Sequence, residues 1–456
     1  MKFRGLASTA FVLALSALAF TSAPAPATSA MRSAGENGPR PFKAEGGRAG
    51  PYATREGRLR IFDEVWEQVR ERYFDPAFGG VDWQEARGDL RPLAAEARDA
   101  SELYAVLRRM LGRLRDPHTR VFAPGDGTDW RVQHYVSIGI SVRELGGALV
   151  VADIERDSQA ARAGVRAGDE LLSIDGETAA ALFARRLSET AAGDTRAARL
   201  QAIARLFDGA AGSAVAINFR RAGETRVRAA RLLREPRTRV PTFDAKREGG
   251  ARLVRFNIFT PEVAAQFARS LRTGLKNARA LVIDLRDNGG GEADSMADVA
   301  SALLPAGLSL GRFTDRGGQV RLEPFTRAAL LSSAETLERF GGPVVILTNA
   351  RTASAAEVFA AAMRERRRAL VVGEQTCGCV LGIRRRHVLP DGGVLDVSEM
   401  DYRTAAGSRL EGTGLTPDML VAPTLEDLRR GRDRALTLAL ELLKAQEGKD
   451  KNDAED

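Results

Sequence analysis

The chain has 456 residues, of which 44% are apolar and 28% charged, a composition typical of folded globular proteins and unlike that of disordered or fibrous chains. Its 68 basic and 60 acidic residues give a net charge of +8, but the positive charges are spread along the chain, which disfavours nucleic-acid binding. Beyond residue 30 no uncharged apolar run approaches the ~18 residues of a membrane-spanning helix. We therefore expect two or three domains and no integral membrane segment in the mature chain.

The first 30 residues are typical of a secretory signal. They combine a basic start, an apolar stretch and small residues near Ala27 and Ala30 that suit cleavage. This predicts export to a periplasm or to the extracellular space, with a short membrane anchor as the alternative. Residues 31–55 are polar and rich in Gly and Pro, as in a linker.

A helical region is predicted over residues 56–130. Apolar residues recur at helical spacing from Arg58 to Phe74 and again from Ser101 to Leu114. The second helix runs into Arg-Asp-Pro-His-Thr at residues 115–119. Because proline disfavours helix in the residue before it, His118 is expected on a turn, where a site residue could lie.

Residues 135–235 are predicted to form a small β-rich domain, with strands at Val136–Val142, Ala148–Ile154 and Ala214–Phe219 and a helix from Ser158. Its residues 137–140, 157–169 and 171–176 resemble a PDZ domain of the bacterial protease type. In that fold a peptide adds to a sheet edge while backbone N–H groups hold its terminal carboxylate. The resemblance implies a carboxylate-binding loop made of Ser137, Ile138, Gly139 and Ile140. A PDZ domain that serves only as a spacer or lid is the alternative.

Residues 245–424 alternate between strand and helix patterns, which predicts a layered α/β core with a largely parallel sheet. The expected strands are Ala251–Ile258, Ala280–Leu285 and Val344–Thr348, and the expected helices are Pro261–Leu275, one after Asp294 and one from Ala355. A final helix is predicted from Glu426 to Leu443 after Thr424 as N-cap, with a solvated, disordered tail to residue 456.

Two strand-to-helix junctions of this core are candidates for chemistry, because helix N-termini offer free N–H groups and favour negative charge. The first is Asp284–Gly291, whose three glycines allow close approach of the backbone to a ligand. The second is Pro343–Glu357, where Ser354 precedes the helix. Each has an ordinary alternative: a plain turn at the glycines, and a helix N-cap at Ser354.

Together these parts resemble the C-terminal processing peptidases, or tail-specific proteases, and their tricorn-core relatives. The resemblance is carried by the stretches Asp284–Gly291, Thr352–Ala355, Gly373–Gly378 and Gly414–Asp418. It implies an α/β, multidomain protein with a ClpP/crotonase-like layered serine-peptidase core, a helical N-terminal region and an inserted PDZ domain. It further implies that Ser354 is the acylated nucleophile, that the N–H groups of Gly290 and Ala355 face the oxyanion, and that no metal or organic cofactor takes part.

The chain departs from this family where a general-base lysine is expected. That position is Cys379, and the glutamine that supports the lysine is replaced by Ile383. No lysine occurs between Lys276 and Lys444, and arginine stays protonated in proteins. We therefore expect the Ser–Lys mechanism to be absent.

Histidine is then the first candidate for the base. The tricorn-like branch places its base histidine in the turn after the N-terminal helices, as His118 is placed, and a glutamate shortly before the closing Gly-x-x-Pro-Asp, as Glu411 is placed. We interpret Ser354, His118 and Glu411 as nucleophile, base and orienting carboxylate. The alternatives are that His118 only fixes a turn and that Glu411 pairs with Arg409.

The other histidines and the two cysteines allow more than one role. His134 and His387 are expected to be structural or solvated, with His387 as a reserve base. Cys377 and Cys379 could be buried packing residues, a local disulfide or reactive thiols, but two cysteines cannot complete a tetrahedral zinc site.

The sequence thus predicts an exported serine endopeptidase that recognises polypeptide C-terminal tails or unfolded proteins, without metal or nucleic acid. One alternative is a degenerate, tail-binding pseudoprotease. Another is a thiol-dependent redox protein built on Cys377 and Cys379.

Overall fold

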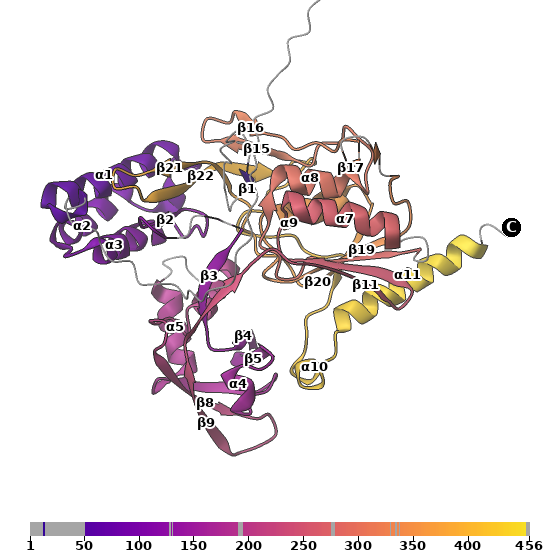
Figure 1. Ribbon diagram of the computed structural model, residues 1–456, viewed down its shortest axis with the longest axis horizontal. Helices are drawn as coiled ribbons and strands as arrows, with labels where there is room; N and C mark the ends of the chain where they lie inside the picture. The colour runs from indigo at the N-terminus through magenta and orange to yellow at the C-terminus, as the bar shows by residue number, and fades with distance from the viewer. Residues whose placement is uncertain are drawn as a thin grey trace, which may run out of the picture.

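The structure is a computed structural model that describes residues 51–452, apart from 127–128, 130, 190–194, 275–278, 329, 333–334 and 337, together with Val12–Leu13. Apart from Val12–Leu13, the predicted signal at 1–30 therefore lies outside the described residues, as does most of the predicted linker at 31–55. Figure 1 shows three parts: a group of N-terminal helices, a small β-rich unit and an α/β core. None of the helices among the described residues is long and apolar enough to cross a bilayer.

The core is built on a six-stranded sheet in the order β11-β12-β13-β19-β20-β23. All neighbouring strands are parallel except β11 and β12, which confirms the predicted, largely parallel sheet. The strands are β11 (Phe243–Glu248), β12 (Ala251–Phe256), β13 (Leu281–Asp284), β19 (Val344–Thr348), β20 (Leu370–Gly373) and β23 (Met419–Leu420).

Helices cover both faces of this sheet (Figure 1). On one face lie α7 (Pro261–Gly274), α8 (Ala293–Ser301) and α9 (Ala355–Glu365), and on the other lies α11 (Arg434–Asn452). Successive strand residues point to opposite faces, so Ile283 packs with α7–α9 while Val282 packs toward α11. Strands buried on both faces are continuous apolar runs, which is why the sequence located them.

A second, antiparallel sheet joins the core to the N-terminal helices. Its order is β16-β15-β22-β2, with β21 also paired to β22. The strands are β2 (Arg120–Phe122), β15 (Arg312–Asp315), β16 (Val320–Leu322), β21 (Gly382–Val388) and β22 (Val394–Arg403). Leu389, Leu395 and Val397 pack into the helical cluster of α1 (Arg55–Arg72), α2 (Trp83–Glu96) and α3 (Ala100–Gly112).

The small β unit, residues 140–233, has a sheet in the order β4-β5-β6-β8-β9, with β7 paired to β6. Its elements are β4 (Ile140–Leu145), β5 (Ala148–Ile154), α4 (Gln159–Arg162), β6 (Glu170–Ile174), β7 (Glu177–Thr178), α5 (Ala179–Glu189), α6 (Arg196–Ala204), β8 (Ala214–Arg220) and β9 (Val227–Leu233). The chain enters through β3 (Gln133–Ser137) and leaves through β10 (Glu235–Arg239), which pair antiparallel. The predicted strand Val136–Val142 is thus two strands of different sheets, because the chain turns at Gly139, where φ is 81°.

The predicted C-terminal helix and tail need two corrections. The helix is divided into α10 (Leu425–Arg430) and α11, because Gly431 adopts the left-handed conformation that ends a helix. The backbone then stays helical to Asn452, through most of the predicted disordered tail. The single Gly448 costs only about 1 kcal/mol relative to alanine, and its neighbours favour helix. Short pairings also join β1 (Val12–Leu13) to β14 (Gly291–Glu292) and β17 (Leu330–Ser332) to β18 (Glu335–Thr336).

Candidate active site

Ser354 lies at the N-terminus of α9, after the loop that follows β19. Its φ of 57° and ψ of −126° are rare for a non-glycine residue, and such conformations cluster at functional sites. The side chain is fully buried and its Oγ has no hydrogen-bond partner among the described residues. Glu357 accepts the Ser354 N–H as in a capping box, but the Ser354 hydroxyl accepts no return bond from the helix among the described residues. The hydroxyl is therefore left available for chemistry.

The two predicted junctions meet at this serine. The Ala353 N–H donates to the Asn288 carbonyl at 2.9 Å, and the Thr352 hydroxyl donates to the Leu285 carbonyl at 2.8 Å. A Cβ built on Gly290 would lie 2.5 Å from the Ser354 Cβ, closer than real atoms approach. Glycine is thus required at position 290 both by this contact and by its φ of 102°.

The predicted oxyanion donors differ in availability. The Gly290 N–H donates to Asn288 Oδ1 at 2.9 Å, so in this structure it is already occupied. Ala355 is the first residue of α9, and the first N–H groups of a helix have no intrahelical acceptor. The end of the helix also favours negative charge. Ala355 therefore fits an oxyanion site as it stands, whereas Gly290 would have to share its N–H with Asn288.

A buried carboxylate, Glu357, holds the chain around the nucleophile through four hydrogen bonds. Its Oε2 accepts the N–H of Ser354 at 3.1 Å and that of Cys379 at 2.9 Å. Its Oε1 accepts the N–H of Gly378 at 2.8 Å and the hydroxyl of Thr376 at 2.5 Å. Burial raises the pKa of the Glu357 carboxyl, against the effect of these four bonds. One side chain thus holds the helix start and the loop 376–379 together.

Cys377 and Cys379 form a disulfide within this loop. Of the three alternatives, the local disulfide is the one that the structure contains. The Cys379 carbonyl accepts the Ser354 N–H at 2.9 Å, and the Cys377 N–H donates to the Thr352 carbonyl at 3.0 Å. The disulfide therefore closes the stretch of backbone that fixes Ser354.

His118 is buried on the turn after α3, as predicted. Its backbone N–H donates to Asp116 Oδ1 at 2.8 Å, and its Nδ1 lies 3.5 Å from the same oxygen, too long for a hydrogen bond. Burial acts to raise the pKa of the Asp116 carboxyl, but His118, Ser398 and Thr119 hold it below its usual value. The Ser398 N–H in turn donates to Thr119 Oγ1 at 3.0 Å, which ties this turn to β22.

Glu411 lies in the same neighbourhood without contacting His118. Its Oε2 accepts the Val380 N–H at 2.7 Å, one residue beyond the disulfide, and Arg409 pairs with Asp401 rather than with Glu411. Burial, with help from the charge of nearby Asp116, raises the pKa of the Glu411 carboxyl to about 8. Among the described residues, no hydrogen bond or ion pair joins Glu411, His118 and Ser354 to one another. The structure brings the three into one region but does not assemble a bonded triad.

The two remaining histidines make structural contacts. His387 Nε2 lies 2.7 Å from Glu399 Oε1 inside the β21–β22 pair, and both side chains are buried. His134 Nδ1 lies 3.2 Å from Thr238 Oγ1 in the β3–β10 ribbon. Both agree with the structural roles expected from the sequence, and the reserve-base hypothesis for His387 gains no support.

The predicted carboxylate-binding loop at Ser137, Ile138, Gly139 and Ile140 connects β3 to β4. The Gly139 N–H donates to the Ser137 hydroxyl at 2.9 Å, and that hydroxyl donates to Glu155 Oε1 at 2.7 Å. The loop therefore satisfies one of its own N–H groups.

The small β unit also contacts the loop that holds the nucleophile. Arg143 of β4 pairs with Glu374 at 2.6 Å, and Arg196 of α6 donates to the Gln375 carbonyl at 3.2 Å. Glu374 and Gln375 directly precede Thr376, so one short segment joins the small β unit to the Glu357 network.

Sequence reasoning missed three polar residues of this site. Glu357 was detectable, because serine followed three residues later by glutamate before an apolar run is a capping-box pattern. Asp116 stands two residues before His118 and was visible in the same turn. Apart from its place in the stretch Gly373–Gly378, nothing in the sequence indicated a role for Thr376, because Glu357, which accepts its hydrogen bond, lies 19 residues away in the chain.

Two family descriptions match the chain. Peptidase family S41 matches residues 247–421, which include both junctions, and the tricorn protease C1 domain matches residues 54–112, which include the N-terminal helices. The chain is 29% identical over 382 residues to carboxyl-terminal-processing peptidase 2 of Arabidopsis thaliana chloroplasts, covering 78% of this chain and 68% of that protein. It is 28% identical over 378 residues to a carboxyl-terminal-processing protease of a Picosynechococcus species, covering 78% and 82%.

Solved structures show the same architecture. A photosystem II D1 C-terminal processing protease matches with a TM-score of 0.53 and 27% identity, over 83% of this chain and 98% of that one. Mature CPAF matches with a TM-score of 0.61 over 82% and 94%, at 16% identity, which supports the fold alone. The expected mixed α/β class is confirmed. Residues 247–421 carry a peptidase family S41 domain, and these matches identify the chain as a serine-type peptidase that is similar to the carboxyl-terminal-processing proteases.

Proposed function

We propose that this protein is an exported serine endopeptidase that captures tails or unfolded stretches of polypeptides and cleaves them through an acyl-enzyme on Ser354. The observation that carries the proposal is the Ser354 hydroxyl. It is buried in a strained backbone conformation against Gly290, at the start of α9, and has no hydrogen-bond partner in the described part of the chain. Export rests on the signal-like first 30 residues and is part of the proposal.

The first chemical step is attack of Ser354 Oγ on the substrate carbonyl. Negative charge then develops on the carbonyl oxygen, and the Ala355 N–H at the positive end of α9 is positioned to stabilise it. A second donor, the Gly290 N–H, becomes available when it turns from Asn288 toward the substrate.

His118 is the proposed base, because no lysine occurs between Lys276 and Lys444 and serine needs a proton acceptor. We assign the orienting carboxylate to Asp116 rather than to Glu411. Asp116 lies beside Nδ1 and stays ionised because its pKa is lowered, whereas the Glu411 carboxyl, with a pKa of about 8, is largely neutral at pH 7. A neutral carboxyl stabilises an imidazolium poorly.

The small β unit is the proposed PDZ domain. One of the two outer strands of its described sheet is β4, to which an extended peptide could add, and the loop 137–140 lies at the start of that strand. A terminal carboxylate bound at this loop would compete with Ser137 for the Gly139 N–H.

The second candidate function is a tail-binding pseudoprotease. It is favoured by Cys379 in place of the family lysine and by the lack of a bond between His118 and Ser354. Hydrogen bonds of a catalytic group are often long without substrate and tighten in the complex, so the peptidase remains the better-supported function.

Hydrolysis of an unfolded, casein-like protein by the purified mature chain across pH 5 to 9 separates the two. Ser354→Ala and His118→Ala should abolish cleavage, while His134→Ala, the matched histidine control, should retain it. Asp116→Asn should cost more activity at pH 7 than Glu411→Gln. Cleavage that survives His118→Ala would refute the histidine base, and an inactive wild type that still binds tail peptides would establish the pseudoprotease.

A further inference from the structure

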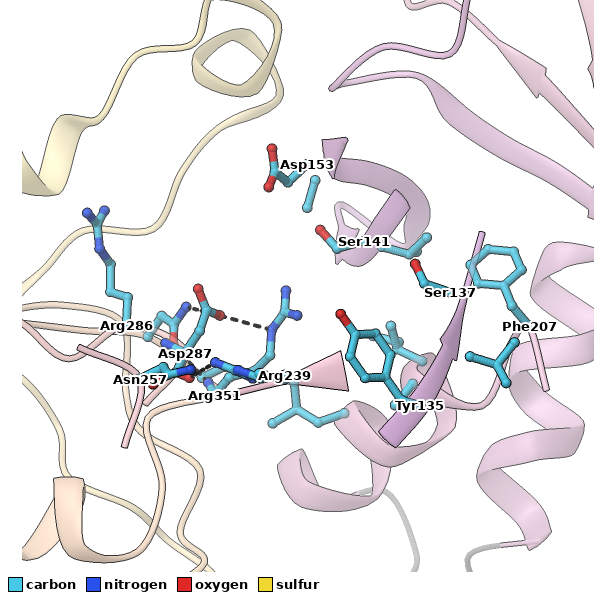
Figure 2. Close-up of a pocket in the computed structure, with 18 of the residues that line it drawn as sticks. Tyr135, Ser137, Ser141, Asp153, Phe207, Arg239, Asn257, Arg286, Asp287 and Arg351 are labelled. Atoms are coloured by element: carbon cyan, nitrogen blue, oxygen red, sulfur yellow. Dashed lines mark hydrogen bonds and ion pairs between the residues drawn. The ribbon is translucent and has the colours of Figure 1, made fainter. Parts of the chain in front are cut away.

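A groove of about 1970 Å³ lies between the small β unit and the core. Figure 2 shows Tyr135, Ser137 and Ser141 on the side of the small β unit, facing Asp287 and Arg351 across the groove. A peptide added to β4 and extended toward the core would run through this space. The side of the groove that the core forms is called the core wall, and its side chains are therefore candidates for recognising the side chains of such a peptide.

That core wall concentrates positive charge around one carboxylate, Asp287. Arg351 Nε lies 3.3 Å from Asp287 Oδ1, and Arg255 Nη2 lies 3.4 Å from Oδ2. Arg239 Nη2 donates to the Asp287 backbone carbonyl at 2.6 Å. Three guanidinium groups thus gather about a single carboxylate, and Figure 2 shows Arg239 and Arg351 beside it.

Among the described residues, these three guanidinium groups have two carboxylates within ion-pair distance, Asp287 and Asp284. Asp284, 3.7 Å from Arg255, is already paired with Arg286 at 2.7 Å. Among the described residues, no carboxylate lies within ion-pair distance of Arg239. Burial acts to raise the pKa of Asp287, but Arg351, Asn349 and the other arginines hold it below its usual value, as a positive local potential requires.

These guanidinium groups are accessible and lie close to the nucleophile along the chain. The side chains of Arg351 and Arg255 are 50% and 52% exposed, and Arg239 is also exposed. Arg351 stands three residues before Ser354, and Asp287 stands three residues before Gly290. A peptide that enters Ser354 from the groove must pass this wall.

We propose that the core wall formed by Arg239, Arg255 and Arg351 binds acidic side chains of the substrate, on the segment between the small β unit and the scissile bond. This inference rests on the proposed peptidase function. The wall makes the enzyme selective for polypeptides with aspartate or glutamate in that segment.

The test uses internally quenched peptides of one sequence in which a pair of residues is Asp, Asn or Lys, moved stepwise along the peptide. All are amidated at the C-terminus, so that only side-chain carboxylates differ. For the wild type we expect kcat/KM for the best Asp peptide to exceed that of its Asn counterpart about tenfold, which corresponds to about threefold for each of two exposed ion pairs. Added salt should reduce this ratio.

The double variant Arg239→Gln/Arg351→Gln should bring the Asp-to-Asn ratio close to one. Arg226→Gln, an exposed arginine outside the groove, is the matched control and should keep the wild-type ratio. Charge reversal with Arg239→Glu/Arg351→Glu should favour the Lys peptide. A wild type that cleaves the three peptides equally overturns this inference, whereas a wild type that cleaves none of them, nor casein, overturns the proposed peptidase itself.

Discussion

Replacing Glu411 by glutamine should change how the stability of the protein depends on pH. Burial raises the pKa of this carboxyl from its usual 4.5 to about 8 in the folded chain, whereas the unfolded chain keeps the ordinary value. Below pH 4.5 both states are protonated and folding is not penalised. As the pH rises from 4.5 to 8, the unfolded chain releases its proton while the folded chain retains it. The wild type must therefore lose stability through this window and level off above it.

The magnitude follows from the size of the shift. A difference of about 3.5 pKa units corresponds to at most ~5 kcal/mol at about 1.4 kcal/mol per unit. Because the Glu411 side chain keeps some contact with solvent, we expect about 2 kcal/mol. Glutamine does not titrate, so the variant should gain this amount relative to the wild type between pH 5 and 8.5.

Urea unfolding measured at half-unit steps over that range supplies the free energies. The informative quantity is the difference between variant and wild type, in which the other titrating groups cancel. Glu96→Gln, at the exposed end of α2, is the control for replacing a glutamate by glutamine outside the site. If the Glu411→Gln difference stays within about 0.5 kcal/mol across the range, the carboxyl is not buried as the structure has it.

Three further changes test the residues that surround Ser354. Gly290→Ala places a Cβ 2.5 Å from the Ser354 Cβ and should lower kcat about 10²-fold in a peptide assay, with a thermal melt to show that the chain still folds. Glu357→Ala leaves the N–H groups of Gly378 and Cys379 and the Thr376 hydroxyl without their acceptor and should cost about 3 kcal/mol or more of unfolding free energy by urea titration. Glu357→Gln should be milder, and equal losses would contradict the role of these bonds. Reduction of the disulfide between Cys377 and Cys379 by dithiothreitol should lower activity several-fold, because it loosens the backbone that holds the Ser354 N–H. A Cys377→Ser/Cys379→Ser variant should not respond to the reductant. Unchanged activity, once titration has shown two free thiols, would exclude this effect.

Local patterns in the sequence were sufficient for the parallel core. Strand β19 was predicted at its observed bounds because Val344–Thr348 is apolar on both faces and is preceded by a proline. The two junctions that hold Ser354 and Gly290 were found for a similar reason, since each comes after a buried strand, whereas the roles of the two residues came from the family resemblance. Their mutual contact is a consequence of β13 and β19 being neighbours in the sheet.

The antiparallel sheet could not be predicted in the same way. Strand β22 buries Asp396, Ser398 and Glu399, which read as surface residues when seen alone. Asp396 is matched by Arg120 and Arg386, and Glu399 by His387, from other strands. Such pairing depends on partners that only the folded chain brings together. The hydrogen bond from the Gly290 N–H to Asn288 could not be predicted from the sequence either.

The pairing of β2 with β22 has a consequence for the order of synthesis. The Thr119 hydroxyl, beside the proposed base, accepts a bond from Ser398, a residue made 279 positions later. Strand β23, which completes the edge of the core sheet beside β20, comes later still. A chain still emerging from the ribosome therefore carries the turn of His118 long before it can hold that turn in place. The attachment of this turn to β22 must therefore wait until Ser398 has been synthesised, which separates in time the synthesis of the His118 turn from its fixation.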